Sequence, residues 1–289
     1  MNRLVLGTAQ FGLPYGVANK SGQVSRAEAM LMLRIASQNF IDTIDTAITY
    51  GESEECLGSI GLEDFKVVTK LPSIQKGCLN IGDWVHDQVK LSLSRLGLGQ
   101  LYGLLIHNSE DLLGPNGSAL YRGLDSLKEK GLVKKIGVSI YSPNELESLT
   151  KDFSFDLIQA PFNLIDQRLL QSGWMKKLKD NGVEIHARSA FLQGLLLMKE
   201  KDIPAKFSPW KHLWKIWHLW LAENKVSALQ GSLAFSLSFP EIDRVVVGAD
   251  SHDQLVEIIN STNILLNVGL PDLICADENL INPTNWPKL

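Results

Sequence analysis

Short apolar runs alternate with longer segments of helical periodicity along nearly the whole chain. Each run has the length of a strand buried on both faces, and the segments between runs place apolar residues three or four positions apart. The runs that we predict as strands are residues 3–7, 41–44, 65–69, 101–106, 133–138, 155–160, 183–187 and 244–247. Such strict alternation indicates parallel strands that are covered by helices.

Eight of these units predict an α/β fold, a (β/α)8 TIM-type barrel, rather than an open, doubly wound sheet. The Gly-x-Gly-x-x-Gly motif that follows the first strand of many open dinucleotide-binding folds is absent. No linker or low-complexity segment interrupts the pattern. We therefore predict one barrel domain over residues 1–289.

The main helices are predicted at residues 25–39, 53–60, 83–96, 118–130, 173–181, 226–239 and 252–260, with one more starting at Pro143. The residues of the first helix that we expect to face inward are Ala29, Met30, Leu33 and Ala36. Ser53 is expected to cap the second helix, with Glu54 near the positive end of its dipole.

A helical excursion is predicted at residues 199–224, after the seventh strand. Its tryptophans are spaced so that they lie roughly on one helical face, at Trp210, Trp214, Trp217 and Trp220. Such a stripe usually packs into a core, and the alternative is a lid or a wall of the substrate pocket. The C-terminal tail, rich in Asn, Pro and Trp, is predicted to be a surface strap.

The composition is that of an ordinary globular protein, with 289 residues, 45% hydrophobic and 21% charged residues and a net charge of −4. The absence of a basic patch argues against a nucleic-acid partner. The three cysteines and six histidines lack metal-ligand spacing, so we expect no metal. Neither a membrane-spanning run nor a secretory leader is found, and we expect a cytoplasmic protein without membrane contact.

Four chemically matched residues follow three consecutive strands. Asp45 and Tyr50 come after the second strand, Lys70 ends the third and His107 ends the fourth. Active sites of such barrels form at these carboxyl ends. A neighbouring ammonium group should lower the pKa of Tyr50 from its usual value of about 10, Asp45 should hold the ammonium group, and His107 should donate to a substrate oxygen.

This set of side chains suits the reduction of a small-molecule carbonyl substrate. A proton is delivered to the oxygen as hydride arrives at the carbon. No side chain among the four can donate hydride, so the hypothesis requires a nicotinamide cofactor. The alternative is an isomerase, which transfers protons only and needs no nicotinamide.

Seven short motifs occur in order along the chain. They are Leu-Gly-Thr-Ala-Gln-Phe-Gly at 6–12, Asp-Thr-Ala-Ile-Thr-Tyr-Gly-Glu-Ser-Glu at 45–54, Val-Val-Thr-Lys at 67–70, Leu-Leu-Ile-His at 104–107, Ile-Gly-Val-Ser at 136–139, Gln-Ala-Pro-Phe-Asn-Leu at 159–164 and Val-Val-Gly-Ala at 246–249. The ordered set resembles that of the aldo-keto reductase family. The resemblance implies a TIM-type barrel that interconverts carbonyls and alcohols with NADP(H), and sometimes with NAD(H).

The resemblance also assigns site residues. It implies that Tyr50 is the general acid/base and that Asp45, Lys70 and His107 support it. It implies that Ser139 and Gln159 contact the nicotinamide carboxamide, that residues 188–195 cross the pyrophosphate, and that residues after the eighth strand hold the adenosine. The full set implied for the cofactor is Thr8, Ala9, Asp45, Ser139, Gln159, Arg188, Ser189, Gln193, Gly194, Leu195, Gly248, Ala249, Gln254 and Glu257.

Three positions depart from the family pattern. Ile140 replaces a frequent Asn, and Arg188 stands where an aromatic residue often stacks on the nicotinamide; its guanidinium can also stack, or attract an anion. Asp250 follows the last strand, and no Lys or Arg lies between residues 245 and 260 to meet a 2′-phosphate. NADP(H) is therefore the family default and NAD(H) the alternative. A non-catalytic, cofactor-binding or regulatory barrel of the same family is the alternative function.

Overall fold

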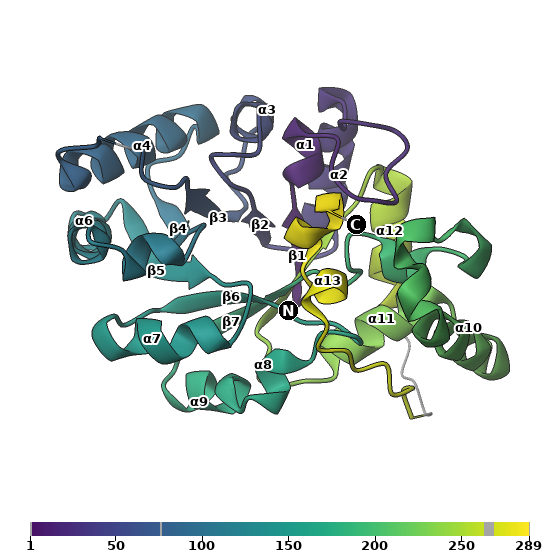
Figure 1. Cartoon of the computed structure of the whole chain (residues 1–289). Coiled ribbons are helices and arrows are strands. Elements are labelled where there is room, and N and C mark those ends of the chain that lie inside the picture. Colours follow the sequence, from purple (N-terminus) through teal and green to yellow (C-terminus); the bar gives the residue numbers. More distant parts are fainter. Residues whose placement is uncertain (1, 76, 263–268, 289) are drawn as a thin grey trace.

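The eight predicted strands form a closed parallel barrel, a (β/α)8 TIM barrel (Figure 1). The computed structural model describes residues 2–75, 77–262 and 269–288. The strands are β1 (Leu4–Gly7), β2 (Thr43–Asp45), β3 (Lys66–Leu71), β4 (Leu101–Ile106), β5 (Val133–Ser139), β6 (Leu157–Pro161), β7 (Glu184–Arg188) and β8 (Arg244–Gly248). Each strand pairs with the next in sequence, and β8 pairs with β1 to close the barrel.

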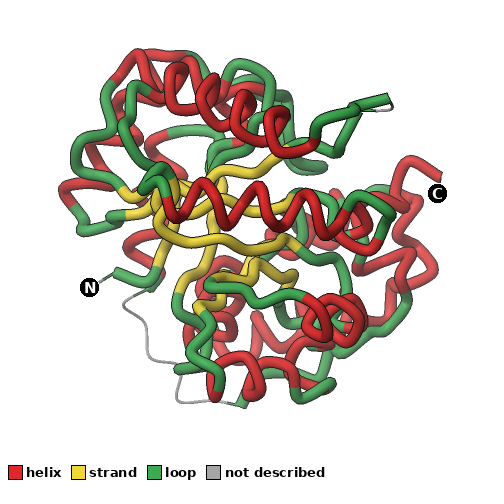
Figure 2. The backbone as a smooth tube through the Cα atoms, turned by 90° about the vertical axis from the view of Figure 1, so that its left-hand side faces the viewer, coloured by secondary structure: helices red, strands yellow, loops and turns green. Residues whose placement is uncertain are grey.

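Helices surround the strands on the outside of the barrel (Figure 2). The α-helices are α1 (Ala9–Gly12), α2 (Arg26–Gln38), α3 (Ser53–Ile60), α4 (Ile81–Leu96), α5 (Glu110–Leu113), α6 (Gly117–Glu129), α7 (Asn144–Asp152), α8 (Arg168–Gln171), α9 (Trp174–Asp180), α10 (Lys211–Asn224), α11 (Ala228–Leu237), α12 (His252–Ser261) and α13 (Glu278–Ile281). Short 3-10 helices are η1 (Leu195–Leu197), η2 (Glu200–Asp202), η3 (Ala205–Trp210) and η4 (Pro283–Lys288). None of the helices in the described ranges is long and apolar enough to cross a membrane.

Strand β3 shows how the fold positions chemistry. Val67 packs in the main core, whereas its neighbour Val68 belongs to a separate small cluster with Leu105 and Leu157. Side chains alternate between the two faces of a strand, so Lys70 lies on the same face as Val68. The strand thus carries Lys70 to the end of the barrel with its side chain turned inward.

The inward face of α2 differs from the prediction by one position. Met32 is fully buried and packs in the core, while Met30 is 45% exposed. The predicted residues Ala29, Leu33 and Ala36 are buried. Both methionines lie three or four residues from another apolar residue, so helical spacing alone does not predict which of them faces the core.

Ser53 begins α3 and Glu54 lies in its first turn, as predicted, but Ser53 is not the N-cap of the helix. Glu52 is the N-cap of α3, and the Ser53 hydroxyl instead donates to Thr8 at the end of β1. Glu54 is almost fully buried, where it accepts hydrogen bonds from Thr69 and Ser92 and pairs with Arg95. These two residues therefore connect α3 to the strands and to α4.

The tryptophans of the excursion pack into the core, so the lid interpretation is wrong. Trp210, Trp214 and Trp217 are buried, and Trp220 stacks on Trp217 with ring centroids 5.6 Å apart. None of the four lines the cavity described below. The tail is also anchored more deeply than a surface strap, because Trp286 is buried against Phe207.

Candidate active site

A cavity of about 780 Å³ opens at the carboxyl ends of the strands. It is lined by most of the residues that the sequence assigns to the site, namely Thr8, Ala9, Asp45, Tyr50, Lys70, His107, Ser139, Gln159, Arg188, Ser189, Gln193, Gly194, Gly248, Gln254 and Glu257. Leu195 and Ala249 do not line it, because both side chains are buried in the core. Strands far apart in sequence thus contribute to one concave surface.

A buried ion pair lies on the floor of this cavity. The Lys70 ammonium donates to Asp45 Oδ1 at 2.7 Å and to the Thr46 carbonyl at 2.8 Å. The other oxygen of Asp45 accepts from Gln159 Nε2 at 2.7 Å. Asp45 therefore fixes both Lys70 and Gln159, and the link to Gln159 could not be seen in the sequence because it joins strands on opposite sides of the barrel.

Tyr50 lies beside both Lys70 and His107. The Lys70 ammonium is 5.2 Å from the centroid of the Tyr50 ring, and the His107 ring meets that ring edge-on at 5.9 Å. Burial and the charge of Asp45 raise the pKa of Tyr50 well above its usual value. The expectation that Lys70 lowers this pKa is wrong for the net shift, because burial and the charge of Asp45 dominate it. Tyr50 stays protonated and can donate a proton at any ordinary pH.

His107 is neutral at physiological pH. Burial, together with the positive charges of Lys70 and Arg188, lowers the pKa of His107 from 6.5 to about 4. Its Nδ1 atom lies 3.2 Å from the Thr49 hydroxyl. A neutral imidazole in this position can donate one hydrogen bond to a ligand without bringing a further positive charge.

We expect the His107 ring to titrate at about pH 4 when its proton chemical shifts are followed by NMR. The unfolded chain takes up this proton near pH 6.5, whereas the folded chain takes it up only near pH 4. Protonation therefore favours the unfolded chain between these values, and the free energy of unfolding is highest above pH 6.5. This contribution of His107 is lost as the pH falls from 6.5 to about 4. Stability relative to a His107→Gln variant should decrease over this window.

His252 provides the matched control for this titration. Its pKa is raised by its hydrogen bond to Glu28, so its ring should titrate above 6.5 in the same spectra. Titration of both rings near 6.5 would show that the cavity does not shield His107.

Arg188 ends β7 and forms part of the cavity wall. It donates to the Ile140 carbonyl at 2.9 Å and to the Ser189 hydroxyl at 3.2 Å. Its guanidinium lies over the ring of Tyr141, 4.7 Å from the centroid. Ile140 itself is fully buried, so this position offers only its backbone to the site.

The family model described as the aldo/keto reductase family matches residues 3–268. The chain belongs to the aldo-keto reductase family. It is 25% identical to the uncharacterized oxidoreductase YqkF of Bacillus subtilis, over 91% of this chain and 92% of that protein. It is also 25% identical to the L-galactose dehydrogenase of Arabidopsis thaliana, over 92% and 89% of the two chains.

A solved aldo-keto reductase shares the barrel. AKR11C1 from Bacillus halodurans, in its holo form, superimposes with a TM-score of 0.73 over 92% of this chain and 88% of that one, at 18% identity. This likeness supports the (β/α)8 fold. The family and the named relatives together identify the chain as one of a family of oxidoreductases.

Two loops of this aldo-keto reductase meet across the cavity. The Val17 amide donates to the Gln193 carbonyl at 3.2 Å, and Gln193 Nε2 donates to the Tyr15 hydroxyl at 3.3 Å. Ser189, Leu192 and Gln193 have positive φ angles, which are uncommon for non-glycine residues. Tyr15 was missed by the sequence analysis, because nothing in a single loop indicates which other loop it meets.

Asp250 is held at the rim beside this bridge. It accepts from Asn19 Nδ2 at 3.2 Å, and burial raises its pKa. Asn19 also accepts from the Ser21 and Gly22 amides, which shapes its own loop. An Asn that accepts from the amides two and three residues later is a turn signal that the sequence can show. Its contact with Asp250 joins residues 231 positions apart and cannot be predicted from local sequence.

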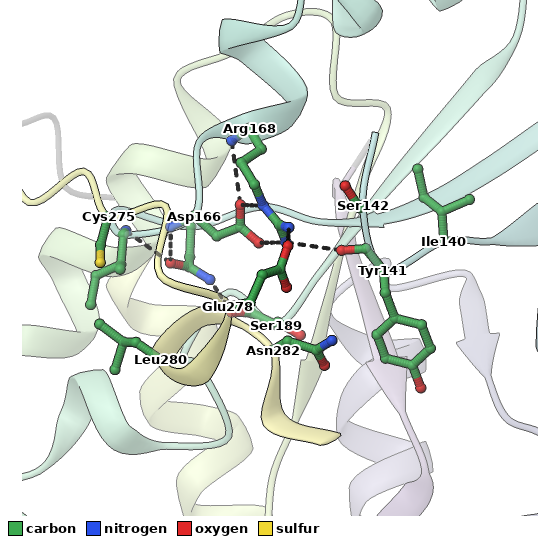
Figure 3. A network of polar contacts seen from close by, with 12 residues as sticks. Ile140, Tyr141, Ser142, Asp166, Arg168, Ser189, Cys275, Glu278, Leu280 and Asn282 are labelled. Carbon is green, nitrogen blue, oxygen red and sulfur yellow. Dashed lines mark hydrogen bonds and ion pairs between the residues drawn. The ribbon is translucent and has the colours of Figure 1, made fainter. Parts of the chain in front are cut away.

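The C-terminal segment completes the rim through Pro283 and Thr284. Figure 3 shows how it is attached: Arg168 pairs with the buried Asp166, with Glu278 of α13, and donates to the Tyr141 carbonyl at 2.9 Å. One guanidinium thus joins the tail to the loop that carries Tyr141.

Proposed function

We propose that the protein reduces a carbonyl compound to an alcohol with a bound NAD(P)H, and that Tyr50 is the proton donor. The observation that carries the proposal is a protonated, half-buried phenol next to the Asp45–Lys70 pair, facing a cavity of about 780 Å³. That volume lies within the range of roughly 300–1,000 Å³ that small-molecule and cofactor sites occupy.

The donors and acceptors that line the cavity fit a nicotinamide dinucleotide. Ser139 donates to Gln159 Oε1 at 3.3 Å, Gln159 donates to Asp45 at 2.7 Å, and both polar side chains line the cavity. Residues of the 189–194 loop line the cavity, and so do Gln254 and Glu257 of α12. We assign these groups to the carboxamide, the pyrophosphate and the adenosine respectively. The bound nicotinamide would supply the hydride.

The protein's own residues then supply the proton. His107 and Tyr50 would hold the carbonyl oxygen by hydrogen bonds. The carbonyl oxygen would take the Tyr50 proton when hydride reaches the carbonyl carbon. The Lys70 ammonium, 5.2 Å from the phenol ring, would offset part of the cost that burial and Asp45 impose on the negative charge left on Tyr50. Atoms balance, because one hydride and one proton convert the carbonyl to the alcohol.

The direct test follows the loss of reduced-nicotinamide absorbance with a panel of aldehydes, ketones and sugars. Turnover that requires both the cofactor and a carbonyl compound is expected. Calorimetry with NADH and NADPH accompanies it: tight binding without turnover would favour the non-catalytic, regulatory barrel. Isomerisation without any nicotinamide would exclude the proposal.

We infer that NAD(H) is preferred to NADP(H). Asp250 and Glu257 both line the α12 side of the cavity, and the described cationic residues that line it, Lys70 and Arg188, lie at the ends of β3 and β7. A 2′-phosphate beside these carboxylates would be repelled. Asp250→Asn should therefore strengthen the binding of NADPH relative to NADH, so that the NADPH dissociation constant divided by the NADH dissociation constant falls by roughly tenfold.

Asp253→Asn is the matched control, because the Asp253 side chain is 89% exposed and lies outside the cavity lining. It should leave the ratio unchanged. Tighter binding of NADPH than of NADH by the unaltered protein would contradict the inference.

A further inference from the structure

Arg188 is a cation in the cavity that no carboxylate neutralises. No ion pair of Arg188 occurs within the described ranges, whereas Lys70 is paired with Asp45 at 2.7 Å. The two hydrogen bonds of Arg188, to the Ile140 carbonyl and the Ser189 hydroxyl, leave further guanidinium N–H groups for a ligand. A half-buried cation is stabilised when a bound anion provides the missing charge.

The balance of charge around Tyr50 points the same way. Asp45 and Lys70 are paired with each other, and His107 is neutral. Arg188 is the charged group without an ion-pair partner among the described residues, and its charge opposes the effect of burial on the pKa of Tyr50 and adds to that effect on the pKa of His107. Its field therefore reaches the position that we assign to the carbonyl oxygen.

The guanidinium is also held in place before any ligand binds. Tyr141 lies under it at 4.7 Å, and the Tyr141 carbonyl is fixed by Arg168, which in turn pairs with Asp166 and Glu278 (Figure 3). A positioned planar guanidinium suits recognition of a carboxylate or phosphate through two parallel hydrogen bonds. A neutral group in the same place would gain only an ordinary hydrogen bond, without the pairing of charges.

We propose that the substrate is a carbonyl compound with an anionic group, a carboxylate or a phosphate ester, and that Arg188 binds that group while Tyr50 protonates the carbonyl oxygen. This assignment rests on the proposed reductase activity. The same guanidinium chemistry would also suit a phosphate of the dinucleotide, so the test separates the two sources of the anion.

The experiment compares matched substrates that differ in charge: para-carboxybenzaldehyde against benzaldehyde, and glyceraldehyde phosphate against glyceraldehyde. In Arg188→Gln, kcat/KM for the charged members should fall by about 10- to 100-fold. Any contribution of Arg188 to cofactor binding is lost by both members of a pair, so the ratio of kcat/KM for the charged member to that for the uncharged member should fall by about tenfold or more. Arg188→Lys should recover part of this ratio. The cofactor dissociation constant of each variant is measured alongside, which separates a loss of cofactor binding from a loss of substrate selectivity.

Arg122→Gln serves as the control for removal of an exposed arginine, on α6 and away from the cavity. Equal losses for charged and uncharged substrates in Arg188→Gln would overturn the proposal. Weaker cofactor binding with an unchanged preference between the substrates would assign the guanidinium to the dinucleotide instead.

An equilibrium measurement keeps this proposal separate from the reductase activity. If no carbonyl compound is turned over, calorimetry with benzoate and benzamide still tests the anion site. Stronger binding of benzoate by the unaltered protein, lost in Arg188→Gln, supports the site even though the proposed function fails. Equal binding of the two ligands by the unaltered protein overturns it.

Discussion

Replacing Tyr50 by Phe should lower kcat/KM for carbonyl reduction by about 10²- to 10⁴-fold, the usual contribution of a positioned general acid. The ring remains to pack beside His107 and Lys70, so only the proton donor is removed. No hydrogen bond of the Tyr50 hydroxyl to another described residue is formed, and the variant should therefore fold with unchanged stability. Steady-state rates with the most active carbonyl compound measure the effect.

The pH dependence provides an independent check on the same role. Because the pKa of Tyr50 is raised, the phenol is protonated over the neutral range, and reduction should show no loss of rate from its ionisation there. Oxidation of the alcohol needs the phenolate and should become faster as the pH rises. Tyr121→Phe, on the outside of the barrel, is the control. A Tyr50→Phe enzyme that retains its rate within about tenfold would remove Tyr50 from the chemistry.

The barrel could be predicted because its strands are buried on both faces and appear as continuous apolar runs. Strand β1 is buried at every position, and the predicted run differs from it by one residue at the start. β2 is less well predicted: Ile41 is buried but precedes the strand, which runs instead to Asp45. Some buried residues lie outside the hydrogen-bonded part of a strand. Apolar runs therefore predict where a strand lies more accurately than they predict its first and last residues.

The candidate catalytic residues could be predicted for a related reason. Asp45, Lys70 and His107 each lie at or directly after a strand end, and parallel barrel strands present those ends on one rim. The shift in the pKa of Tyr50 could not be predicted, because it depends on burial by the whole rim. Contacts such as Gln159 with Asp45, or Tyr141 with Arg188, join distant segments and leave no periodic signal.

Replacing Lys70 by Met should destabilise the protein by about 3–5 kcal/mol, the usual cost of breaking a buried ion pair from one side. Lys70 and Asp45 have side-chain exposures of 1% and 6%, so the carboxylate would be left buried with Gln159 as its remaining partner. For a chain of this size, such a loss corresponds to a decrease in melting temperature of roughly 10 °C. Thermal unfolding of the purified variant measures it.

Lys66→Met is the matched control, because Lys66 lies on the same strand and pairs with Asp42 at 2.8 Å near solvent. An exposed pair contributes about 0–1 kcal/mol, so this variant should melt within a few degrees of the unaltered protein. Similar melting temperatures for the two variants would show that the Lys70–Asp45 pair is not effectively buried.

The double variant Asp45→Asn, Lys70→Met separates lost attraction from the cost of an unpaired charge. If the cost arises because a carboxylate is left buried without its cation, neutralising Asp45 should recover part of the stability lost in Lys70→Met. The Asn side chain can still accept from Gln159 Nε2, which donates to Asp45 in the unaltered protein. Stability would then return while reduction stayed slow, because the ammonium group that stabilises the deprotonated Tyr50 is still missing. A double variant less stable than Lys70→Met would show instead that Asp45 has a structural role of its own.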